Sequence, residues 1–247
     1  MSILRAVGLT KRYGGLLACA GLDLSVRTGT IHALIGPNGA GKSTAIGLLS
    51  GEIAPDSGHV HFNDADITRI STPGRVRLGM TRSFQITNIL PQFTALQNVA
   101  LVAQVRAGHS FRFLRNASAD RALTDPAAAM LARVGLGDRA ATPAEDLAHG
   151  EQRQLELAMA LMTGARLLLL DEPMAGLGAA ESQEMTGLLS ALRGEVTVLL
   201  VEHDMDAVAA LADQVSVLVA GRVIAEGSFA DMQADAAVRA AYLGDHV

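Results

Sequence analysis

One glycine-rich segment, Gly36-Pro-Asn-Gly-Ala-Gly-Lys-Ser-Thr44, limits the folds open to this chain more than any other part of its sequence. It fits the pattern G-x-x-x-x-G-K-[ST], follows the apolar run Ile31–Ile35, and opens a helical pattern that continues through Leu49. In such a strand–loop–helix unit, successive backbone N–H groups converge on phosphate oxygens, and the helix N-terminus favours their negative charge. The sequence therefore predicts a site for a nucleoside triphosphate, formed by Gly36, Pro37, Asn38, Gly39, Ala40, Gly41, Lys42, Ser43 and Thr44.

Two side chains of this segment have distinct expected roles. Lys42 should reach the β- and γ-phosphates, and the Ser43 hydroxyl should ligate Mg²⁺. The alternative is a glycine-rich turn that only caps a helix. The strand before the loop and the helix after it favour the phosphate site, because that is the context the pattern requires.

Short apolar runs and helical patterns alternate along the rest of the chain. With 247 residues, of which 49% are hydrophobic, the chain is near the upper limit for a single core. The first part is predicted to form strands, including Leu22–Val26 and Gly58–Phe62, and from about Gln97 to Leu161 apolar residues recur at helical spacing. Strands then alternate with helices, which indicates a parallel sheet covered on both faces. These later elements are predicted over Leu167–Leu170, Ala179–Leu192, Val196–Val201, Met205–Leu211 and Val215–Val219.

Composition excludes several kinds of protein. The net charge of −5 gives no global basic field that would recruit nucleic acid or anionic lipid. Cys19 is the single cysteine, so an intrachain disulfide is impossible and a reducing compartment fits. The N-terminus does not have the pattern of a signal peptide, and no apolar run approaches the roughly 20 residues that cross a bilayer. We expect a cytoplasmic chain that other subunits would hold at a membrane.

A second segment, Leu167-Leu-Leu-Leu-Asp-Glu172, is an apolar strand that ends in two acids. The carboxyl end of a buried strand in an open α/β sheet faces the ligand crevice. Asp171 would therefore support Mg²⁺, and Glu172 would polarise the attacking water. Alone, two acids before Pro173 are more typical of a helix N-cap, but the phosphate loop in the same chain favours the catalytic interpretation.

A third segment, Leu147-Ala-His-Gly-Glu-Gln-Arg-Gln-Leu-Glu156, resembles the LSGGQ signature of ABC transporter ATP-binding subunits. With the phosphate loop and LLLLDEP, the resemblance covers essentially the whole chain. It implies one domain, 1–247, with a P-loop NTPase core and antiparallel β subdomain in residues 1–88 and 155–247, and an inserted helical subdomain in 89–154. In this family two protomers enclose two ATP molecules, and the signature of one contacts the γ-phosphate bound by the other. The corresponding residues here are Ala148, His149, Gly150 and Glu151.

Three further roles follow from the same resemblance. Gln85 in Arg82-Ser-Phe-Gln is similar to the glutamine that touches Mg²⁺ or water and reports on the membrane partner. His203 in Val201-Glu-His-Asp-Met is similar to the switch histidine at the γ-phosphate, although a lone histidine is usually structural. Tyr13 is similar to the aromatic residue that stacks on adenine, and its alternative is a tyrosine at a strand edge.

Three residues depart from the common family pattern. Ala148 replaces the signature serine, His149 replaces the first signature glycine, and Gly178 stands where Asp or Asn usually links the protomers. A hydrogen bond to a charged group contributes roughly 1.5–3 kcal/mol, so these losses would slow the cycle without abolishing it. A nucleotide-binding structural subunit with low activity therefore stays open as an alternative.

The motifs TRSFQ, LAHGEQRQLELA, AGLG and VEHDM, with Ala241-Tyr-Leu-Gly244, most resemble the ATPases of branched-chain amino acid importers and their urea and amide relatives. That subfamily implies a second ATPase subunit, identical or homologous, two transmembrane permease subunits and, indirectly, a periplasmic or extracellular solute-binding protein. The chain would then lie on the cytoplasmic face of the membrane and energise import. An ATPase of a lipid or lipopolysaccharide exporter is the rival within the family. A soluble member acting on DNA or ribosomes fits neither the length nor the charge.

The segment after Gln85, Ile86-Thr-Asn-Ile-Leu-Pro-Gln-Phe93, holds several apolar side chains. Leu90 and Phe93 flank Pro91, which disfavours a continuous helix and would leave them available on a bend. The resemblance implies that a short helix of the permease docks in this region. Packing inside the chain is the alternative, and for Ile86 the two stay open.

Overall fold

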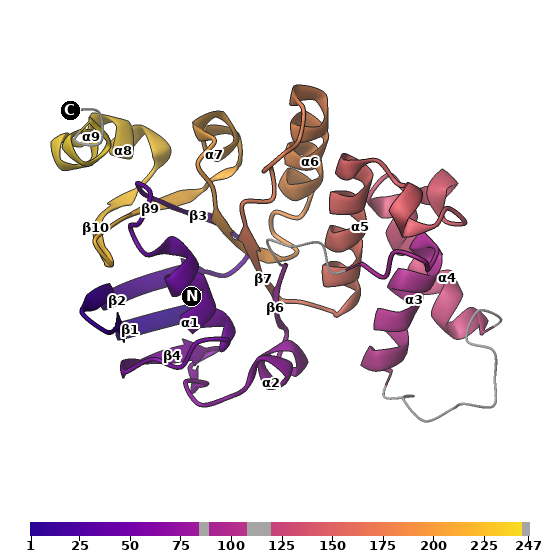
Figure 1. Ribbon diagram of the computed structural model, residues 1–247, viewed down its shortest axis with the longest axis horizontal. Helices are drawn as coiled ribbons and strands as arrows, with labels where there is room; N and C mark the ends of the chain where they lie inside the picture. Colours follow the sequence, from indigo (N-terminus) through magenta and orange to yellow (C-terminus); the bar gives the residue numbers. More distant parts are fainter. Residues whose placement is uncertain (84–88, 108–119, 244–247) are drawn as a thin grey trace. The chain divides into compact units, whose positions relative to one another are not determined.

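The computed structural model describes residues 1–83, 89–107 and 120–243 (Figure 1). The chain divides into two compact units, each described here by itself. Unit 1 consists of Met1–Arg82, Arg166–Met174 and Leu189–Val247, and unit 2 consists of Ser83–Ala165 and Ala175–Leu188. Within the described ranges, no helix is long and apolar enough to cross a membrane.

Unit 1 begins with an antiparallel sheet. This four-stranded sheet has the order β2-β1-β4-β5 and is built from β1 (Ser2–Tyr13), β2 (Leu16–Arg27), β4 (Ser57–Phe62) and β5 (Ala65–Asp66). Buried and open positions alternate along much of β1 and β2, which shows that one face of this sheet is buried and the other is not. The strands predicted over Leu22–Val26 and Gly58–Phe62 are confirmed as parts of β2 and β4.

The second sheet of unit 1 is six-stranded and has the order β10-β9-β3-β8-β7-β6. Every pair is parallel except the antiparallel edge pair of β9 and β10. All residues of β3, β7 and β8 are buried, as expected for parallel strands covered on both faces. The strands are β3 (Ile31–Ile35), β6 (Met80–Arg82), β7 (Leu167–Asp171), β8 (Thr197–Val201), β9 (Gln214–Val219) and β10 (Arg222–Gly227).

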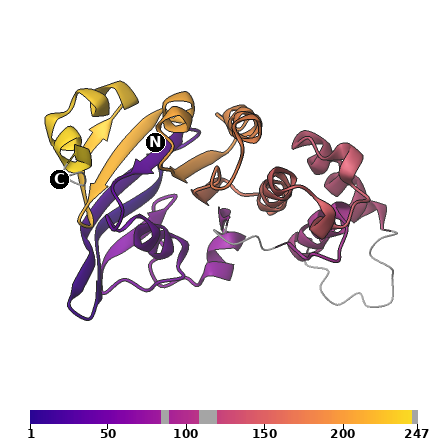
Figure 2. The ribbon, with the colours of Figure 1, turned by 45° about the horizontal axis from the view of Figure 1, so that its top comes forward.

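Helices cover both faces of the six-stranded sheet. On one face α1 (Lys42–Ser50) lies between the two sheets (Figure 1), and Ile46 and Leu49 pack there with Leu34 of β3. On the other face, Ala33 and Ile35 pack with residues of α7 (Met205–Leu211), α8 (Phe229–Ala234) and α9 (Ala236–Leu243). Figure 2 shows α8 and α9 in yellow beside β10. Alternate residues of β3 thus pack into two different hydrophobic cores, so this strand lies in the middle of the unit. The remaining helix of the described part of this unit is α2 (Thr72–Arg77).

Unit 2 is helical. It contains α3 (Ala95–Arg106), α4 (Arg121–Arg133), α5 (His149–Met162), the short 3₁₀ turns Gly137–Arg139 and Ala144–Asp146, and the first part of α6 (Ala179–Ala191). Thr94 and Gln97 form a capping box at the start of α3, which accounts for where that helix begins. The predicted helical segment 89–154 lies within this unit, and its limits as a subdomain stay a prediction.

The predicted fold class is confirmed: a parallel sheet, an antiparallel sheet and a helical insertion are all present. Ile31–Ile35 and Met205–Leu211 have the predicted bounds, and most of the other predicted strands and helices differ by a residue at an end. The exception is the strand predicted over Leu22–Val26, because β2 begins six residues earlier, at Leu16.

Candidate functional site

The phosphate loop connects β3 to α1 in unit 1. Gly41, directly before the helix, has φ 103°, a left-handed conformation that favours glycine. A Cβ at this position would also lie 2.3 Å from the carbonyl oxygen of Ala18, so a larger residue could not fit. The loop closes on itself through a hydrogen bond from the Ala40 amide to the Pro37 carbonyl at 3.2 Å. The glycines therefore allow the compact turn that the sequence pattern predicts.

Lys42 lies within this loop with 9% of its surface exposed. Its ammonium donates to the carbonyl oxygens of Gly36 at 2.6 Å and Pro37 at 3.1 Å. Burial lowers the pKa of Lys42, while the nearby carboxylates of Glu172 and Asp171 oppose that shift. Both predicted acids therefore lie near enough to the predicted cation to influence its pKa.

Asp171 is the last residue of β7 and is only 3% exposed. Burial raises the pKa of its carboxyl, and the neighbouring Arg82 opposes the rise. Arg82 donates to Oδ2 of Asp171 at 3.0 Å and also pairs with Glu52. Arg82 was not among the predicted site residues, although an arginine at the carboxyl end of a strand (β6) was a usable signal.

Glu172 follows Asp171 in a left-handed backbone conformation, with φ 50°. Non-glycine residues rarely adopt this region, so the surrounding structure must hold it. The Glu172 amide donates to the carbonyl oxygen of Val201 at 2.9 Å, which ties the end of β7 to the end of β8. The Glu172 side chain is 30% exposed, so it is open to water.

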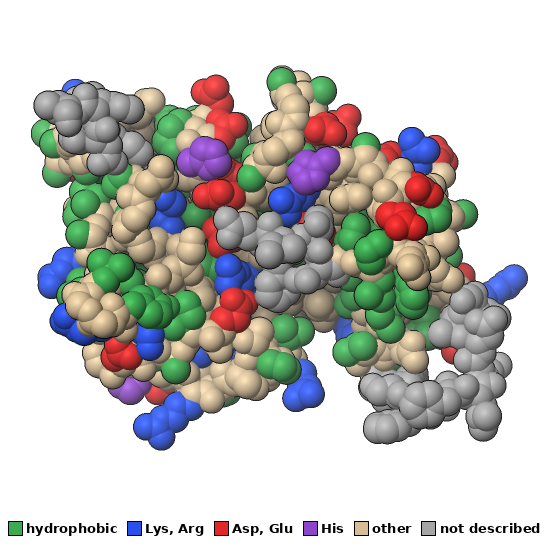
Figure 3. Space-filling model, viewed as in Figure 1, with side chains coloured by type: hydrophobic (Ala, Val, Ile, Leu, Met, Phe, Trp, Pro, Cys, Tyr) green, Lys and Arg blue, Asp and Glu red, His purple; other side chains and the backbone are tan. Residues whose placement is uncertain are grey.

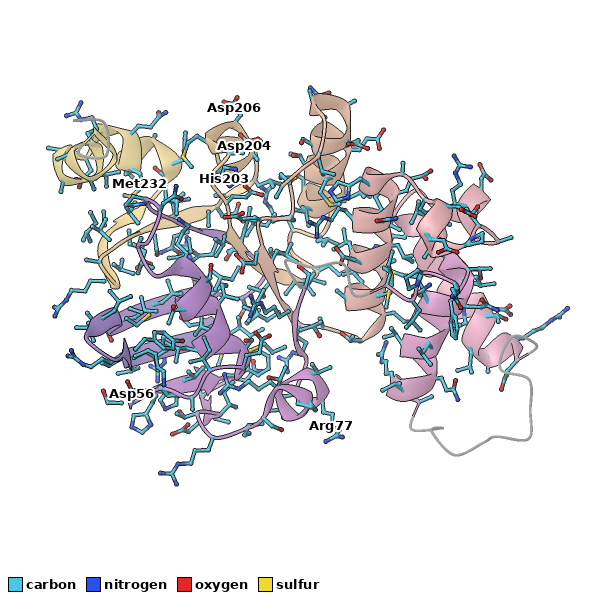
Figure 4. The ribbon with its side chains drawn as sticks, viewed as in Figure 1. Asp56, Arg77, His203, Asp204, Asp206 and Met232 are labelled. Carbon is cyan, nitrogen blue, oxygen red and sulfur yellow. The ribbon has the colours of Figure 1, made fainter. Side chains whose placement is uncertain are left out.

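His203 lies between β8 and α7, beside Asp204 (Figure 4). Its Nδ1 is 3.8 Å from Oε1 of Glu172 and 3.8 Å from Oε2 of Glu202, and its side chain is 64% exposed. The structure therefore places the predicted histidine next to the predicted base, with its ring open to solvent.

Glu202 is a buried carboxylate that the sequence interpretation missed. It is 1% exposed, its Oε1 accepts a hydrogen bond from the Met174 amide at 3.0 Å, and its Oε2 accepts from the His203 amide at 3.0 Å and the Asp204 amide at 3.3 Å. Its position beside His203 at the end of a core strand was the available signal. One carboxylate thus joins the segment after β7 to the segment after β8.

Tyr13 ends β1 with 47% of its surface exposed. The Lys11 ammonium lies 5.7 Å from the centre of its ring, within cation–π range, and is itself paired with Asp56 at 2.9 Å. The ring is held from one side and remains open enough to stack on a planar group. Its role at adenine stays a prediction.

The signature residues begin α5 in unit 2. Ala148 is the N-cap residue and has no side-chain oxygen for the first helical amides, whereas Ser would supply one. Glu151 performs half of a capping box, because its Oε2 accepts from the Ala148 amide at 2.9 Å. Arg139 donates to Oε1 of the same Glu151 at 2.8 Å.

Glu181 of α6 supplies the missing cap. Its Oε1 accepts from the Gly150 amide at 3.3 Å, and its Oε2 accepts from the Gly178 amide at 2.9 Å. A Cβ on Gly150 would lie 2.6 Å from Oε1, so glycine permits this approach. His149 is close to the same loop, since a Cβ on Gly176 would lie 3.0 Å from its Nε2. Gly178 thus bonds Glu181 directly, and Ala148 and His149 precede Gly150, whose amide bonds the same glutamate. The sequence interpretation did not select Glu181.

Gln85 and Ile86 lie outside the described residues. Residues 90–94 form a turn in unit 2, and Asn98 of α3 holds this turn. The fully buried Asn98 amide accepts from the Leu90 amide at 2.8 Å and donates to the carbonyl oxygens of Leu90, Phe93 and Thr94. Leu90 and Phe93 remain 38% and 44% exposed.

Comparisons with known proteins agree with this geometry. Residues 19–175 match the ABC transporter family, and residues 222–247 match the branched-chain amino acid ATP-binding cassette transporter family. The chain is 38% identical to the high-affinity branched-chain amino acid transport ATP-binding protein BraF of Pseudomonas aeruginosa, over 98% of each chain. It is 36% identical to the corresponding protein LivG of Escherichia coli, again over 98% of each chain.

Solved structures show the same fold. A nucleotide-free ATP-binding cassette from an ABC transporter superimposes with a TM-score of 0.87 at 28% identity, over 98% of this chain and 99% of the other. An ATP-binding cassette in its ADP conformation gives a TM-score of 0.88 at 28% identity, over 99% of each chain. The chain therefore belongs to the ABC transporter family and is one of its nucleotide-binding ATPases. The predicted family resemblance is confirmed.

Proposed function

We propose that this chain is the ATP-hydrolysing subunit that energises an importer of branched-chain amino acids or related small polar solutes. The observation that carries the proposal is the 38% identity to BraF over 98% of both chains. The separate match of residues 222–247 to the branched-chain amino acid cassette family supports the same subclass. In this proposal the chain works on the cytoplasmic face of the membrane and contacts permease subunits, which in turn receive solute from a binding protein.

The phosphate loop binds the triphosphate of ATP through its backbone amides and Lys42. Because the ammonium is already bonded to the loop carbonyls of Gly36 and Pro37, it is preorganised within the loop and needs little reorganisation on binding. Tyr13 stacks on the adenine ring, with the Lys11 cation behind it. These groups bind and orient ATP.

The residues present fit a magnesium ion. Asp171 is a buried carboxylate whose pKa burial raises, so a cation beside it would relieve the cost of its charge. Ser43 is exposed directly after Lys42 and offers a hydroxyl, and oxygen donors of these two kinds are what Mg²⁺ prefers. We assign Ser43 and Asp171 as the protein ligands, with Gln85 as a third group. The ion would neutralise charge on the β- and γ-phosphate oxygens.

Glu172 is the base in this proposal. Its carboxylate takes a proton from water as the water oxygen attacks the γ-phosphorus, and the bond to the bridging oxygen breaks to give ADP and inorganic phosphate. His203, 3.8 Å from Glu172, donates to the γ-phosphate from the adjacent loop. Lys42 stabilises the charge on the phosphates while Glu172 accepts the proton of the attacking water.

A second ATPase subunit completes the catalytic unit. We assign Ala148, His149, Gly150 and Glu151 to the γ-phosphate of ATP held by that partner, because α5 begins here and a helix N-terminus favours an anion. The partner is a second copy or a homologous chain. Gly178 lacks the side chain that usually links protomers, and Glu181 bonds its amide instead.

The apolar turn of unit 2 is our candidate contact with the permease. Leu90 and Phe93 are exposed on a turn that buried Asn98 fixes, so their exposure is a property of an ordered backbone. Leu101 and Val105, one helical turn apart on α3, are also exposed, at 39% and 65%. Figure 3 shows hydrophobic side chains gathered over this helix. We call Leu90, Phe93, Leu101 and Val105 the unit 2 apolar surface.

Transport is the direct test of the proposed function. In cells that lack this chain, uptake of radiolabelled leucine, isoleucine and valine should fall, and expression of the wild-type chain should restore it. The Glu172→Gln variant should be expressed but should not restore uptake. If uptake of all three amino acids is unchanged by the deletion while uptake of another solute falls, the substrate assignment is wrong. If a lipid that is normally exported accumulates inside the cells that lack this chain, the chain serves an exporter instead.

The permease contact has its own test. Leu90→Asp with Phe93→Asp should weaken co-purification of the permease subunits while ATP binding by the isolated chain is preserved. Ile224→Asp is the matched control, because Ile224 is a similarly exposed aliphatic residue of unit 1, at 42%. Unfolding of the double variant would place the two residues in the core, and normal assembly would place the contact elsewhere.

A further inference from the structure

Glu202 connects two segments that hold candidate catalytic residues. Its side chain is fully buried, with 0% exposed, yet it is a carboxylate. Burying a charge is costly unless hydrogen bonds compensate it. Here the compensation comes from three backbone amides, those of Met174, His203 and Asp204.

The two oxygens of Glu202 serve different parts of the chain. Oε1 accepts from Met174, two residues after Glu172, at 3.0 Å. Oε2 accepts from the His203 amide at 3.0 Å and from Asp204 at 3.3 Å. Asp204 in turn caps α7, because its Oδ1 accepts from the Asp206 amide at 2.9 Å and the Ala207 amide at 3.2 Å. One rigid carboxylate therefore sets the spacing between the turn after Glu172 and the start of α7.

The backbone of Glu172 shows why such support is needed. With φ 50°, Glu172 is in a conformation that a non-glycine residue keeps only when its surroundings impose it. The bond from its own amide to the Val201 carbonyl fixes one side of the turn, and the bond from Met174 to Glu202 fixes the other. Val201 and Glu202 are adjacent, so the end of β8 holds the turn from both sides.

We propose that Glu202 is a positioning residue for ATP hydrolysis, which holds Glu172 and His203 in register through backbone hydrogen bonds without touching the nucleotide. The proposal rests on the proposed roles of Glu172 and His203. In this proposal Glu202 determines the relative positions of Glu172 and His203, and the phosphate loop determines the affinity for nucleotide. The expected signature is a loss of kcat with ATP affinity preserved.

The variant that tests this is Glu202→Gln, measured in the complex reconstituted with its permease subunits. An amide of the same size keeps one acceptor oxygen and presents an NH₂ group to the other set of amides, so one of the two connections is lost. Small misplacement of a catalytic group costs up to about 100-fold, and we expect kcat to fall roughly 10- to 100-fold. ATP affinity, measured calorimetrically with the purified chain, should stay within about twofold because the phosphate loop is untouched.

Thr197→Val is the matched control. Thr197 begins β8, the strand that Glu202 follows, is 1% exposed, and accepts from the Gly29 amide at 3.0 Å through its hydroxyl. The variant also leaves a backbone amide, the partly buried one of Gly29, without its side-chain acceptor, but away from the candidate catalytic pair. It should lower the melting temperature and leave kcat close to wild type.

The outcomes separate positioning from stability and from the proposed function. A kcat loss in Glu202→Gln with ATP affinity kept and a melting temperature similar to that of Thr197→Val supports the proposal. Wild-type kcat in Glu202→Gln, or a parallel loss of kcat and ATP affinity, overturns it. If Glu172→Gln is as active as wild type, the proposed base is wrong, whatever Glu202→Gln does. Should Glu202→Gln not fold, Glu202→Asp, which keeps the charge but is too short to reach both segments, is measured by the same criteria.

Discussion

The phosphate loop of unit 1 and the signature region of unit 2 are both places where a helix N-terminus meets a glycine, but they are built differently. In the phosphate loop, the charged group is a lysine whose ammonium is held by carbonyls of the loop itself. In the signature region, a carboxylate from another helix, Glu181, bonds the glycine amide. The first arrangement presents positive charge to an anion, and the second sets a negative charge beside the amide that we assign to a phosphate.

The difference follows from which residues match the family pattern. Every position of the phosphate loop fits its motif, so no outside group is needed to complete it. At the signature, Ala148 cannot cap α5, and Glu181 takes over that hydrogen bond. We infer that the phosphate loop of unit 1 can bind nucleotide without help from another group. The Gly150 amide of the signature, by contrast, can bind a phosphate only after its hydrogen bond to Glu181 breaks.

The largest expected effect is that of Glu172→Gln. Removal of a general base typically costs roughly 10²–10⁴-fold, so turnover should nearly stop while ATP still binds. ATP should then hold two chains together, because hydrolysis no longer releases them. Steady-state phosphate release and size-exclusion chromatography with ATP and Mg²⁺ measure the two effects. Turnover within a few-fold of wild type would remove Glu172 from this role.

Lys42→Ala should have the next largest effect. A hydrogen bond to a charged group contributes about 1.5–3 kcal/mol, so ATP affinity should fall roughly 10- to 100-fold. The melting temperature without nucleotide should change little, because the variant also removes the cost of burying an ammonium. Calorimetry with Mg²⁺-ATP is the measurement, and an unchanged affinity would contradict the assignment.

Much of unit 1 could be predicted because its signals are local in sequence. The apolar run Ile31–Ile35 and the loop after it predicted a strand, a turn and a helix, all of which are present. Asp171 and Glu172 were expected at the carboxyl end of a buried strand that faces the ligand crevice, and Asp171 is the last residue of β7.

The supporting residues could not be found in this way, because their partners are distant in the chain. Glu202 bonds Met174, 28 residues away, and Glu181 bonds Gly150, 31 residues away. Glu181 has no local pattern that separates it from a solvated acid, and for Glu202 the local signal was its place beside His203 at the end of a core strand, which does not reveal its partners. Asn98 is similar, because its three acceptor carbonyls are recognisable only after the turn before α3 is seen.

Glu181→Ala is the third prediction and acts on the other side of the comparison. It removes hydrogen bonds to the amides of Gly150 and Gly178, so the free energy of unfolding should fall by about 1–2 kcal/mol. Urea denaturation measures this. Gln154→Ala is the control, because Gln154 also joins α5 to α6, through an exposed bond to Glu184 at 3.3 Å, and should cost much less. If the two variants lower the free energy of unfolding equally, Glu181 does not act as the cap of α5.

The smallest effect is expected for Ala148→Ser, and it tests whether Glu181 replaces the missing serine. Ala148 already has the extended backbone of an N-cap, with φ −60° and ψ 159°, so a hydroxyl there can accept from the first helical amides. In the wild-type background Glu181 occupies the Gly150 amide, and the gain in stability should be a few tenths of a kcal/mol. In the Glu181→Ala background the hydroxyl has that amide to itself, and the gain should approach about 1 kcal/mol. This non-additivity, measured as a double-mutant cycle in urea, is the decisive quantity. The same Ala148→Ser variant should also raise the ATPase activity of the reconstituted complex, because the hydroxyl adds a hydrogen bond to the phosphate. Equal gains in both backgrounds would mean that Glu181 and the serine position act independently, and an unchanged activity would mean that His149 or the partner subunit already supplies the contact.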